Sequence, residues 1–328
     1  AYQQKALDIQ EQILPPNHNI LAISYSNMAS IYRVMGLLPN ALSYLQKAIN
    51  IYTQTIDPKH IKMATAYHNI ADIYLTMKQA DNALAYQQKN ISILQETLNT
   101  NELQMVDSYN QISKIYQAMG QLPQALTYRQ KVIDIQEQTL DKNHPEIESS
   151  YNNIANLYQE MGLLTEALYY RQKTIHILEQ APQIHHINLS SSYSKLAAIY
   201  KATRQLPEAI AAQQKAIDIR EKILPSNHID MAIFYNRMAS IYQDIKQYPE
   251  ALAYQQKDIH IREQSLDKKH PNLAASYGNI AVLYYQMEDM TQAKAYIARA
   301  ISIMQHNYPN GHPDLTAMLQ LRADINKM

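Results

Sequence analysis

Histidine is the first candidate for a chemical role in this sequence, because it recurs at intervals of 42 residues or twice that. The members of this column are His18, His60, His144, His186, His228, His270 and His312. A metal site needs several ligands within about 2 Å of one ion, whereas residues on successive packed helices lie about 10 Å apart. We therefore expect these histidines to cap or pack at the start of a helix. His185 beside His186 has no evident third ligand, so we expect no metal and no cofactor.

Catalytic motifs are missing from the sequence. It has no glycine-rich phosphate loop, no nucleophile elbow and no HExxH, and it contains only five glycines. The lack of cysteine excludes cysteine nucleophiles, disulfides and thiolate zinc sites. Carboxylates such as Asp72, Glu160 and Asp244 are scattered along the chain without the close pairing that acid–base catalysis needs. We therefore predict that the protein is not an enzyme.

A column of positive charge repeats with the same period and could form a track for phosphates. Its members are Lys5, Lys47, Lys89, Lys131, Lys173, Lys215, Lys257 and Arg299. Acids such as Asp134 and Glu137 lie close by and can offset it, and the 29 basic residues of the chain equal its 29 acidic residues. We interpret this column as a solvated outer face and expect no nucleic-acid partner. No apolar run reaches the ~20 residues that span a bilayer, and no signal peptide opens the chain, so we expect a cytoplasmic protein without a membrane partner.

The elements that carry these residues are repeats of fixed length. The stretch YSNMASIY at Tyr25 recurs in related forms at residues 67, 109, 151, 193, 235 and 277, always 42 residues apart. A second block, YLQKAINI at Tyr44, recurs with the same period. Apolar residues in both blocks follow the helical period, and a fixed period of this length is typical of a solenoid. No linker interrupts the pattern, which predicts a single domain.

The ends of the helices can be read from the same columns. Gly36 lies where a left-handed C-cap favours glycine, as do Gly120 and Gly162. Pro suits the first turn of a helix, and Asp or Thr suits its N-cap. The column three residues after Gly36 holds such residues and therefore predicts the start of each second helix. Its members are Pro39, Asp81, Pro123, Thr165, Pro207, Pro249 and Thr291. The first complete hairpin then covers residues 20–35 and 39–55. We predict a half-repeat at 1–19, seven full repeats at about 20–311 and a capping helix at 312–328. Because the chain begins in mid-pattern, we expect it to be part of a larger protein.

The pattern of large, apolar, small and aromatic positions resembles the tetratricopeptide repeat. The residues that carry the resemblance are Tyr25, Met28, Ala29, Tyr32, Gly36, Pro39, Ala41 and Ala48. The 42-residue length and the His144-Pro145 and His270-Pro271 elements are similar to the kinesin light chain subclass, although Ala212 replaces an expected Tyr and residues 99–102 replace a histidine-containing loop. The resemblance implies an all-α, right-handed α-solenoid, or superhelix, of stacked antiparallel helical hairpins whose first helices line the concave face.

A polar stripe remains on the first helices once the packing positions are removed, and the resemblance places it in the concave groove. We predict that a peptide ligand contacts Asn27, Asn69, Asn110, Lys114, Asn152, Asn153, Asn156, Lys195, Lys201, Arg237 and Asn279. Asn offers a donor and an acceptor, which suits the amides of an extended peptide. The cations could meet a carboxylate.

Two functions follow from this pattern. The first is a non-catalytic protein–protein interaction scaffold that binds an extended, acidic or C-terminal peptide in the groove. The second is a structural or self-associating arm of a larger signalling or effector protein, with the groove unused and homo-oligomers formed through the solenoid ends. The polar stripe could also be polar only because it is exposed to water, without binding a ligand. That alternative is compatible with the second function.

Overall fold

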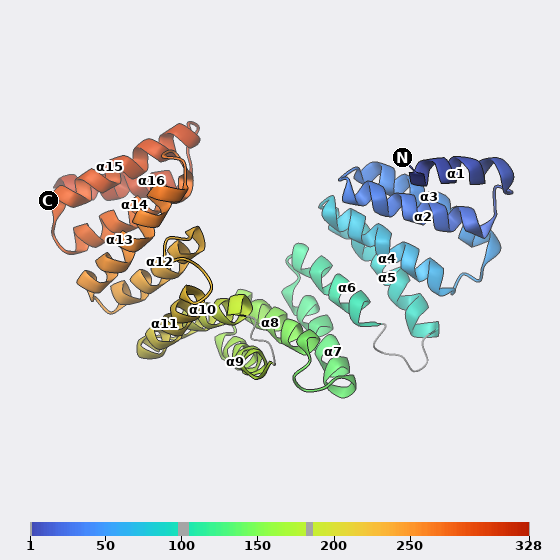
Figure 1. The fold of residues 1–328 in the computed structure, drawn as a ribbon, viewed down its shortest axis with the longest axis horizontal. Coiled ribbons are helices and arrows are strands. Elements are labelled where there is room, and N and C mark those ends of the chain that lie inside the picture. Colours follow the sequence, from blue (N-terminus) through green and yellow to red (C-terminus); the bar gives the residue numbers. More distant parts are fainter. Residues whose placement is uncertain (1, 98–104, 182–185, 328) are drawn as a thin grey trace. The chain divides into compact units, whose positions relative to one another are not determined.

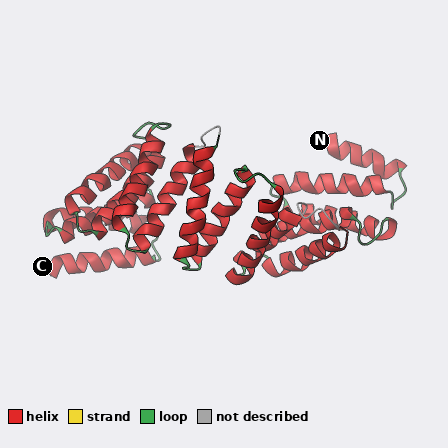
Figure 2. Cartoon of the chain, turned by 90° about the horizontal axis from the view of Figure 1, so that it is seen from below, coloured by secondary structure: helices red, strands yellow, loops and turns green. Residues whose placement is uncertain are grey.

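The computed structural model describes residues 2–97, 105–181 and 186–327. Helices dominate these ranges, and no strand occurs within them (Figure 1 and Figure 2). Contacts between residues divide the chain into two compact units, Ala1–Met161 and Gly162–Met328. Each unit is a stack of helical hairpins, which confirms the all-α solenoid. That residues 1–328 form a single domain stays a prediction.

The first unit contains α1 (Tyr2–Ile13), α2 (Asn19–Val34), α3 (Leu38–Thr55), α4 (Ile61–Thr76), α5 (Ala80–Thr97), α6 (Val106–Ala118), α7 (Leu122–Thr139) and α8 (Pro145–Glu160). Helices α2 and α3, α4 and α5, and α6 and α7 form hairpins, and each second helix packs on the next first helix. The hairpin expected at 20–35 and 39–55 is thus confirmed to within one residue.

The second unit continues the same pattern. Its helices are α9 (Leu164–Gln180), α10 (His186–Ala202), α11 (Leu206–Glu221), α12 (Ile229–Asp244), α13 (Tyr248–Ser265), α14 (Pro271–Gln286), α15 (Met290–Asn307) and α16 (Pro313–Lys327). Hairpins form between α10 and α11, α12 and α13, and α14 and α15, and α16 packs on α15. The cores of both units are built from buried Ala, Ile, Leu and Met with partly buried Tyr around them.

Histidine caps the first helices. The Nδ1 atom of His60 accepts a hydrogen bond from the backbone N–H of Lys62 at 3.1 Å, which satisfies one of the free donors at the start of α4. The same bond is made by His18, His144, His228, His270 and His312. The prediction of a capping role is confirmed for these six residues, and the described residues contain no group of three or more side chains that could hold a metal ion. His185 lies outside the described residues.

The turn inside each hairpin is fixed by backbone hydrogen bonds rather than by glycine. Gly36 has a φ of +74°, its N–H bonds the Arg33 carbonyl at 3.0 Å, and the next N–H bonds the Tyr32 carbonyl at 2.9 Å. Lys78 takes a φ of +60° at the equivalent place and makes the same pair of bonds. The turn therefore requires a residue in the left-handed backbone conformation. Where this residue is not glycine, the conformation costs about 1 kcal/mol of folding free energy.

One expectation about the second helices is wrong. Asp81, Thr165 and Thr291 do not cap α5, α9 and α15, because all three lie inside the first turn. The residue that ends the turn also serves as the N-cap of the second helix, as Leu37 and Leu163 do. In α15 this residue is Asp289, and its carboxylate accepts the Gln292 N–H at 3.0 Å.

The lysine column is exposed to solvent, as interpreted from the sequence, but its ammonium groups also lie over tyrosine rings. Within the hairpin of α2 and α3, Tyr44 stacks on Tyr32 with ring centroids 5.3 Å apart, and the Lys47 ammonium lies 5.3 Å from the Tyr25 ring and 5.2 Å from the Tyr44 ring. This is cation–π geometry, and it recurs for Lys89, Lys131 and Lys257.

Of the two acids expected to offset the lysines, Glu137 accepts a hydrogen bond from the Tyr151 hydroxyl, and Asp134 accepts one from Gln130 on the same helix. The tyrosine–glutamate bond recurs in other hairpins. The Tyr277 hydroxyl donates to Glu263 at 2.6 Å, and the Tyr25 hydroxyl donates to Glu11 at 2.8 Å. Burial, reinforced by the carboxylate, raises the pKa of both tyrosines to about 12. Each hydroxyl thus stays protonated and ties one hairpin to the second helix before it.

We predict that His60→Ala lowers the free energy of unfolding by about 1 kcal/mol, because the variant leaves an N–H at the start of α4 without its partner. His60→Asn should retain most of the stability, since the Asn side chain can accept the same bond. Urea unfolding followed by circular dichroism measures the difference. Equal stability of the Ala variant and the wild type would contradict the capping role.

Candidate functional site

The first unit has a cleft of about 490 Å³ on the face formed by its first helices. Helices α4, α6 and α8 line it, and two side chains of α7 reach it from beneath. The lining residues are His68, Asp72, Leu75, Val106, Asp107, Asn110, Gln111, Lys114, Arg129, Gln136, Glu146, Ser149, Ser150 and Asn153. The structure thus brings together three of the predicted peptide contacts: Asn110, Lys114 and Asn153.

Arg129 of α7 dominates the floor of this cleft. The residue is 5% exposed, and its Nη1 donates to the Oδ1 atom of Asn110 at 2.5 Å. Its Nε is buried and makes no hydrogen bond, and burial lowers the pKa of the guanidinium. Asp72 faces the cleft too, but its carboxylate pairs with Arg33 at 2.6 Å. Lys114 is exposed, and its ammonium is the other cation that lines the cleft.

The second unit has a smaller cleft of about 340 Å³ between α12, α13 and α14. The predicted contact Asn279 lines it, together with Asn236 and the apolar side chains of Ile229, Ile233 and Ala275. These amides and aliphatic groups line the same cleft from α12 and α14, which suits a peptide backbone with an apolar side chain.

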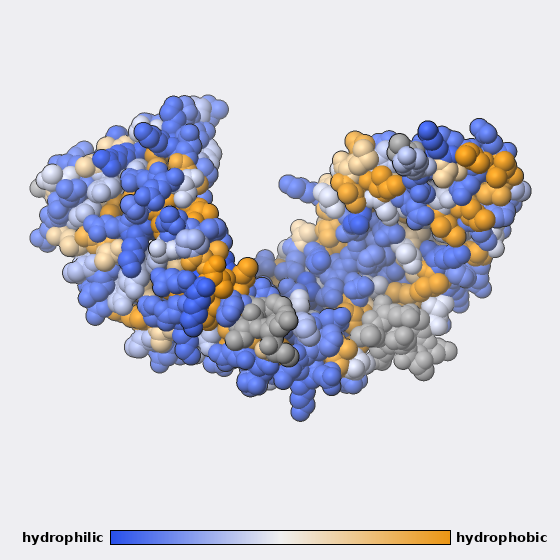
Figure 3. Space-filling model, in the orientation of Figure 1, coloured by the Kyte–Doolittle hydropathy of each residue, from blue (hydrophilic) through white to orange (hydrophobic). Residues whose placement is uncertain are grey.

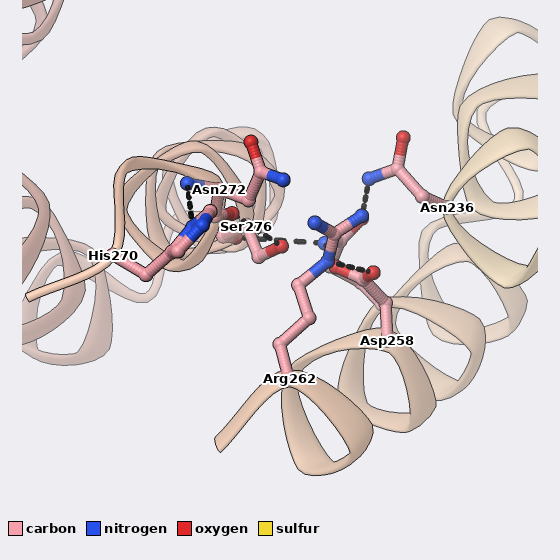
Figure 4. A network of polar contacts seen from close by, with 7 residues as sticks. Asn236, Asp258, Arg262, His270, Asn272 and Ser276 are labelled. Carbon is pink, nitrogen blue, oxygen red and sulfur yellow. Dashed lines mark hydrogen bonds and ion pairs between the residues drawn. The ribbon is translucent and has the colours of Figure 1, made fainter. Parts of the chain in front are cut away.

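A buried polar network supports this second cleft (Figure 4). Asn236 donates to the side-chain oxygen of Gln255 at 3.2 Å, and the Gln255 amide donates to Asp258 at 3.0 Å. Asp258 is fully buried, and Arg262 lies 2.5 Å from its carboxylate. Burial raises the pKa of Asp258, while the hydrogen bonds from Arg262 and Gln255 oppose that rise.

Two predicted contacts are already engaged by other first helices. Arg237 donates to the Ser194 hydroxyl at 2.6 Å, and burial lowers the pKa of Arg237. Lys201 donates to the Ser240 hydroxyl and lies 3.6 Å from Asp244. These side chains join successive repeats, which reduces their capacity for a ligand. The remaining predicted residues do not line either cleft: Asn27, Asn69, Asn152, Asn156 and Lys195.

Reasoning from sequence missed the side chains that come from the second helices. One column, four residues after the buried Ala of each second helix, holds Leu45, Gln87, Arg129, Arg171, Gln213, Gln255 and Ile297. Gln213 and Gln255 reach the first helix of their own hairpin, as Arg129 does, and bond Ser194 and Asn236. The signal was a run of long polar residues within an apolar helical stripe.

The repeats match a known family along most of the chain. The sequence profile of the tetratricopeptide repeat matches residues 1–54, 20–96, 104–180, 146–222 and 230–306. The chain belongs to the tetratricopeptide repeat family. Proteins of this family generally mediate protein–protein interaction and are typically non-catalytic. No curated protein matches the chain in sequence.

Solved structures agree with this assignment. A kinesin light chain-like protein of Podospora anserina with nearly identical repeats is 25% identical, with a TM-score of 0.57 over 63% of this chain and 98% of that one. The signal transduction ATPase of Pyrococcus horikoshii with a tetratricopeptide repeat sensor is 17% identical, with a TM-score of 0.70 over 98% of this chain and 46% of that one. The C-terminal part of a tetratricopeptide repeat-containing protein of Cytophaga hutchinsonii is 15% identical, with a TM-score of 0.59 over 89% of this chain and 98% of that part. The kinesin light chain resemblance is confirmed. None of the described helices is long and apolar enough to cross a membrane.

We predict that Asp258→Asn lowers the free energy of unfolding by about 2–4 kcal/mol, because it leaves the Arg262 guanidinium without its carboxylate. The double variant Asp258→Asn with Arg262→Leu should recover most of this loss. It recreates the residues of α5, where Gln87 bonds Asn90 at 3.1 Å and Leu94 takes the place of the arginine. Thermal and urea unfolding of the wild type, the single variant and the double variant measure these differences in stability. A double variant no more stable than the single variant would contradict this account of the network.

Proposed function

We propose that the protein is an interaction scaffold that binds an extended peptide along the face of its first helices, with the cleft of the first unit as the principal site. The observation that carries the proposal is the 490 Å³ cleft, in which amides and two cations face a single space. Family membership supports a protein partner. The peptide that suits this chemistry carries a carboxylate, from an acidic side chain or from its C-terminus.

The amides of this cleft suit the backbone of an extended peptide. Asn153 is half buried on α8, and Gln111 on α6 is anchored by a bond from its Nε2 to the His68 carbonyl at 3.2 Å. A strand advances about 3.3 Å per residue, and packed helices lie about 10 Å apart. Roughly three peptide residues would therefore pass each first helix, so that one amide side chain can bond the peptide backbone per repeat.

Lys114→Ala and Asn153→Ala should each weaken a peptide selected by display on the full chain, by about threefold to thirtyfold, because each removes a hydrogen bond to the ligand. Neither variant should lower the melting temperature by more than about 2 °C, since both side chains lie on the surface of the cleft. Isothermal titration calorimetry measures the affinity. Lys131→Ala is the matched control, because Lys131 lies over the rings of Tyr109 and Tyr128. A selected peptide whose affinity is unchanged by both cleft variants would remove this cleft from the site.

A second candidate function, self-association, is favoured by the surface of α1 and α2. Apolar side chains gather over these N-terminal helices (Figure 3). Tyr2 is 91% exposed, Val34 is 84% exposed and Ile13 is 71% exposed. Burial of such residues in an interface would be favourable at about 25 cal/mol per Å².

Sedimentation equilibrium tests this candidate. If the α1 surface mediates self-association, the wild type forms an oligomer, and Ile13→Lys returns it to a monomer because a charge enters the apolar contact. Tyr2→Lys serves as a second variant of the same surface. A wild type that stays monomeric at about 100 μM would exclude specific dimers of low-micromolar affinity.

A further inference from the structure

A third cleft, of about 630 Å³, lies in the second unit and is larger than the two described above. Helices α13 and α15 both pack on α14, and side chains of all three helices line the cleft. Its exposed lining residues belong to α13, to α15 and to the loop between α13 and α14. The cleft therefore opens among the second helices and is separate from the two clefts formed by first helices.

This cleft lies where α15 departs from the repeat. Ala298 and Ser302 line it from one exposed face of α15. In α1, α3, α7 and α11 the equivalent pair is polar and longer, and a glutamine bonds the side chain four residues further on at 2.7–3.0 Å. The two short side chains of α15 leave space that such a pair would occupy. The position of Ala298 holds glutamine in every other second helix, at Gln4, Gln46, Gln88, Gln130, Gln172, Gln214 and Gln256.

The base of the cleft is apolar. Leu273 and Ile303 line it and are almost fully buried. The ring of Tyr277 lines it too, and the bond from the Tyr277 hydroxyl to Glu263 at 2.6 Å holds this ring in place. An apolar side chain that entered the cleft would exchange water for contact with these groups, which the hydrophobic effect favours.

The rim of the cleft is positively charged. Lys268 of the loop and Arg299 of α15 line it and are exposed. The Arg299 guanidinium lies 5.8 Å from the centre of the Tyr277 ring, so one cation borders the apolar base. Glu263 is the acid that lines the cleft, and its carboxylate already accepts the hydroxyl of Tyr277. The balance of charge therefore favours a ligand with an acidic group beside an apolar one.

The lining residues favour a helical ligand over an extended one. The two clefts formed by first helices present Asn side chains that suit the free amides of an extended peptide. Asn and Gln do not occur among the described residues that line the third cleft. A helix bonds its own backbone internally, and its side chains three or four residues apart lie about 5–6 Å from one another. That spacing matches the 5.8 Å between Arg299 and the Tyr277 ring.

We propose that this cleft binds an amphipathic helix of a protein partner. One apolar side chain of that helix packs on Leu273 and Ile303, and one acidic side chain, three or four residues away, lies beside Arg299. Proteins of this family generally mediate protein–protein interaction, so a protein partner fits the chain. The site goes beyond the peptide cleft of the first unit, and a chain with both sites holds two partners at once.

The chain itself supplies a variant that should fold. The double variant Ala298→Gln with Ser302→Asp recreates the exposed pair of α7 and α11, where Gln130 bonds Asp134 and Gln214 bonds Asp218. It places a longer side chain and a carboxylate at two lining positions of the cleft. Both changes oppose a ligand that inserts an apolar group beside an acid.

Display selection on the full chain tests the inference. The probe is a library of helical peptides of about 20 residues, in which one apolar position and one charged position four residues later are varied. We expect enrichment of peptides with a large apolar residue followed by Asp or Glu. Isothermal titration calorimetry should show that the double variant weakens these peptides about tenfold or more, because the apolar anchor loses its pocket.

Two single variants and one control separate the contributions. Arg299→Gln should weaken acidic peptides about twofold to fivefold and remove their advantage over peptides with Lys at the charged position. Lys257→Gln is the matched control, because Lys257 lies over the rings of Tyr235 and Tyr254 as Arg299 lies over those of its own hairpin, but it does not line the cleft. Lys257→Gln and Asn153→Ala should both leave the affinity unchanged.

Several results would overturn the inference. These are the absence of any enriched helix that the double variant weakens, equal affinity of the wild type for acidic and basic peptides, or enriched helices that only Asn153→Ala weakens. If the double variant fails to fold, Arg299→Gln gives the comparison at an exposed position, and unchanged affinity there would count against the site equally. A wild-type oligomer that the double variant dissociates in sedimentation equilibrium would assign the cleft to a second copy of this chain instead of a partner. Helices that depend on the third cleft, found without any extended peptide that depends on Asn153, would support this inference and exclude the proposed function.

Discussion

The close crossing of the two helices within each hairpin is the contact on which the rest of the structure depends. Ala41, Ala83 and Ala125 are fully buried at successive crossings. At the third crossing a serine replaces the facing alanine, and the Ser113 hydroxyl donates to the Ala125 carbonyl at 2.9 Å. A larger side chain here would overpack the crossing. Because the helices lie so close, a long side chain one turn further along the second helix reaches past the first helix to its open face.

This reach explains why side chains of the second helices contribute to clefts that are formed mainly by first helices. Arg129, Gln213 and Gln255 each start from the second helix and end on a side chain of the first helix, nineteen positions earlier. The first-helix residues so engaged are held in place by a buried partner. The clefts therefore present the amide groups of Asn110 and Asn236, which a partner from the second helix holds in place.

The fold was largely predictable from the sequence, whereas the site was predictable only in part. A 42-residue period without insertions specifies hairpins, and the histidine caps and the turn at Gly36 follow from local backbone chemistry. Asn110, Lys114 and Asn153 were identified because they remain once the packing stripes are removed. The sequence predicts Arg237 and Lys201 as ligand contacts, and the structure shows that both also bond a neighbouring helix. Periodicity cannot distinguish a side chain that faces a ligand from one that faces the next repeat. Arg129 was not predicted because core positions were assigned from the helical period of apolar residues, and a charged residue inside an apolar stripe does not fit that pattern.

The tyrosine clusters also determine how this protein interacts with light. The chain has no tryptophan, 26 tyrosines and one phenylalanine, so phenol rings dominate its intrinsic emission. Rings such as those of Tyr32 and Tyr44 lie 5.3 Å apart, which is close enough for excitation to pass from one to the other. Separation of the two helices of a hairpin would separate these rings and raise the polarisation of the emitted light. The protein thus carries a native optical reporter of hairpin integrity in its repeats.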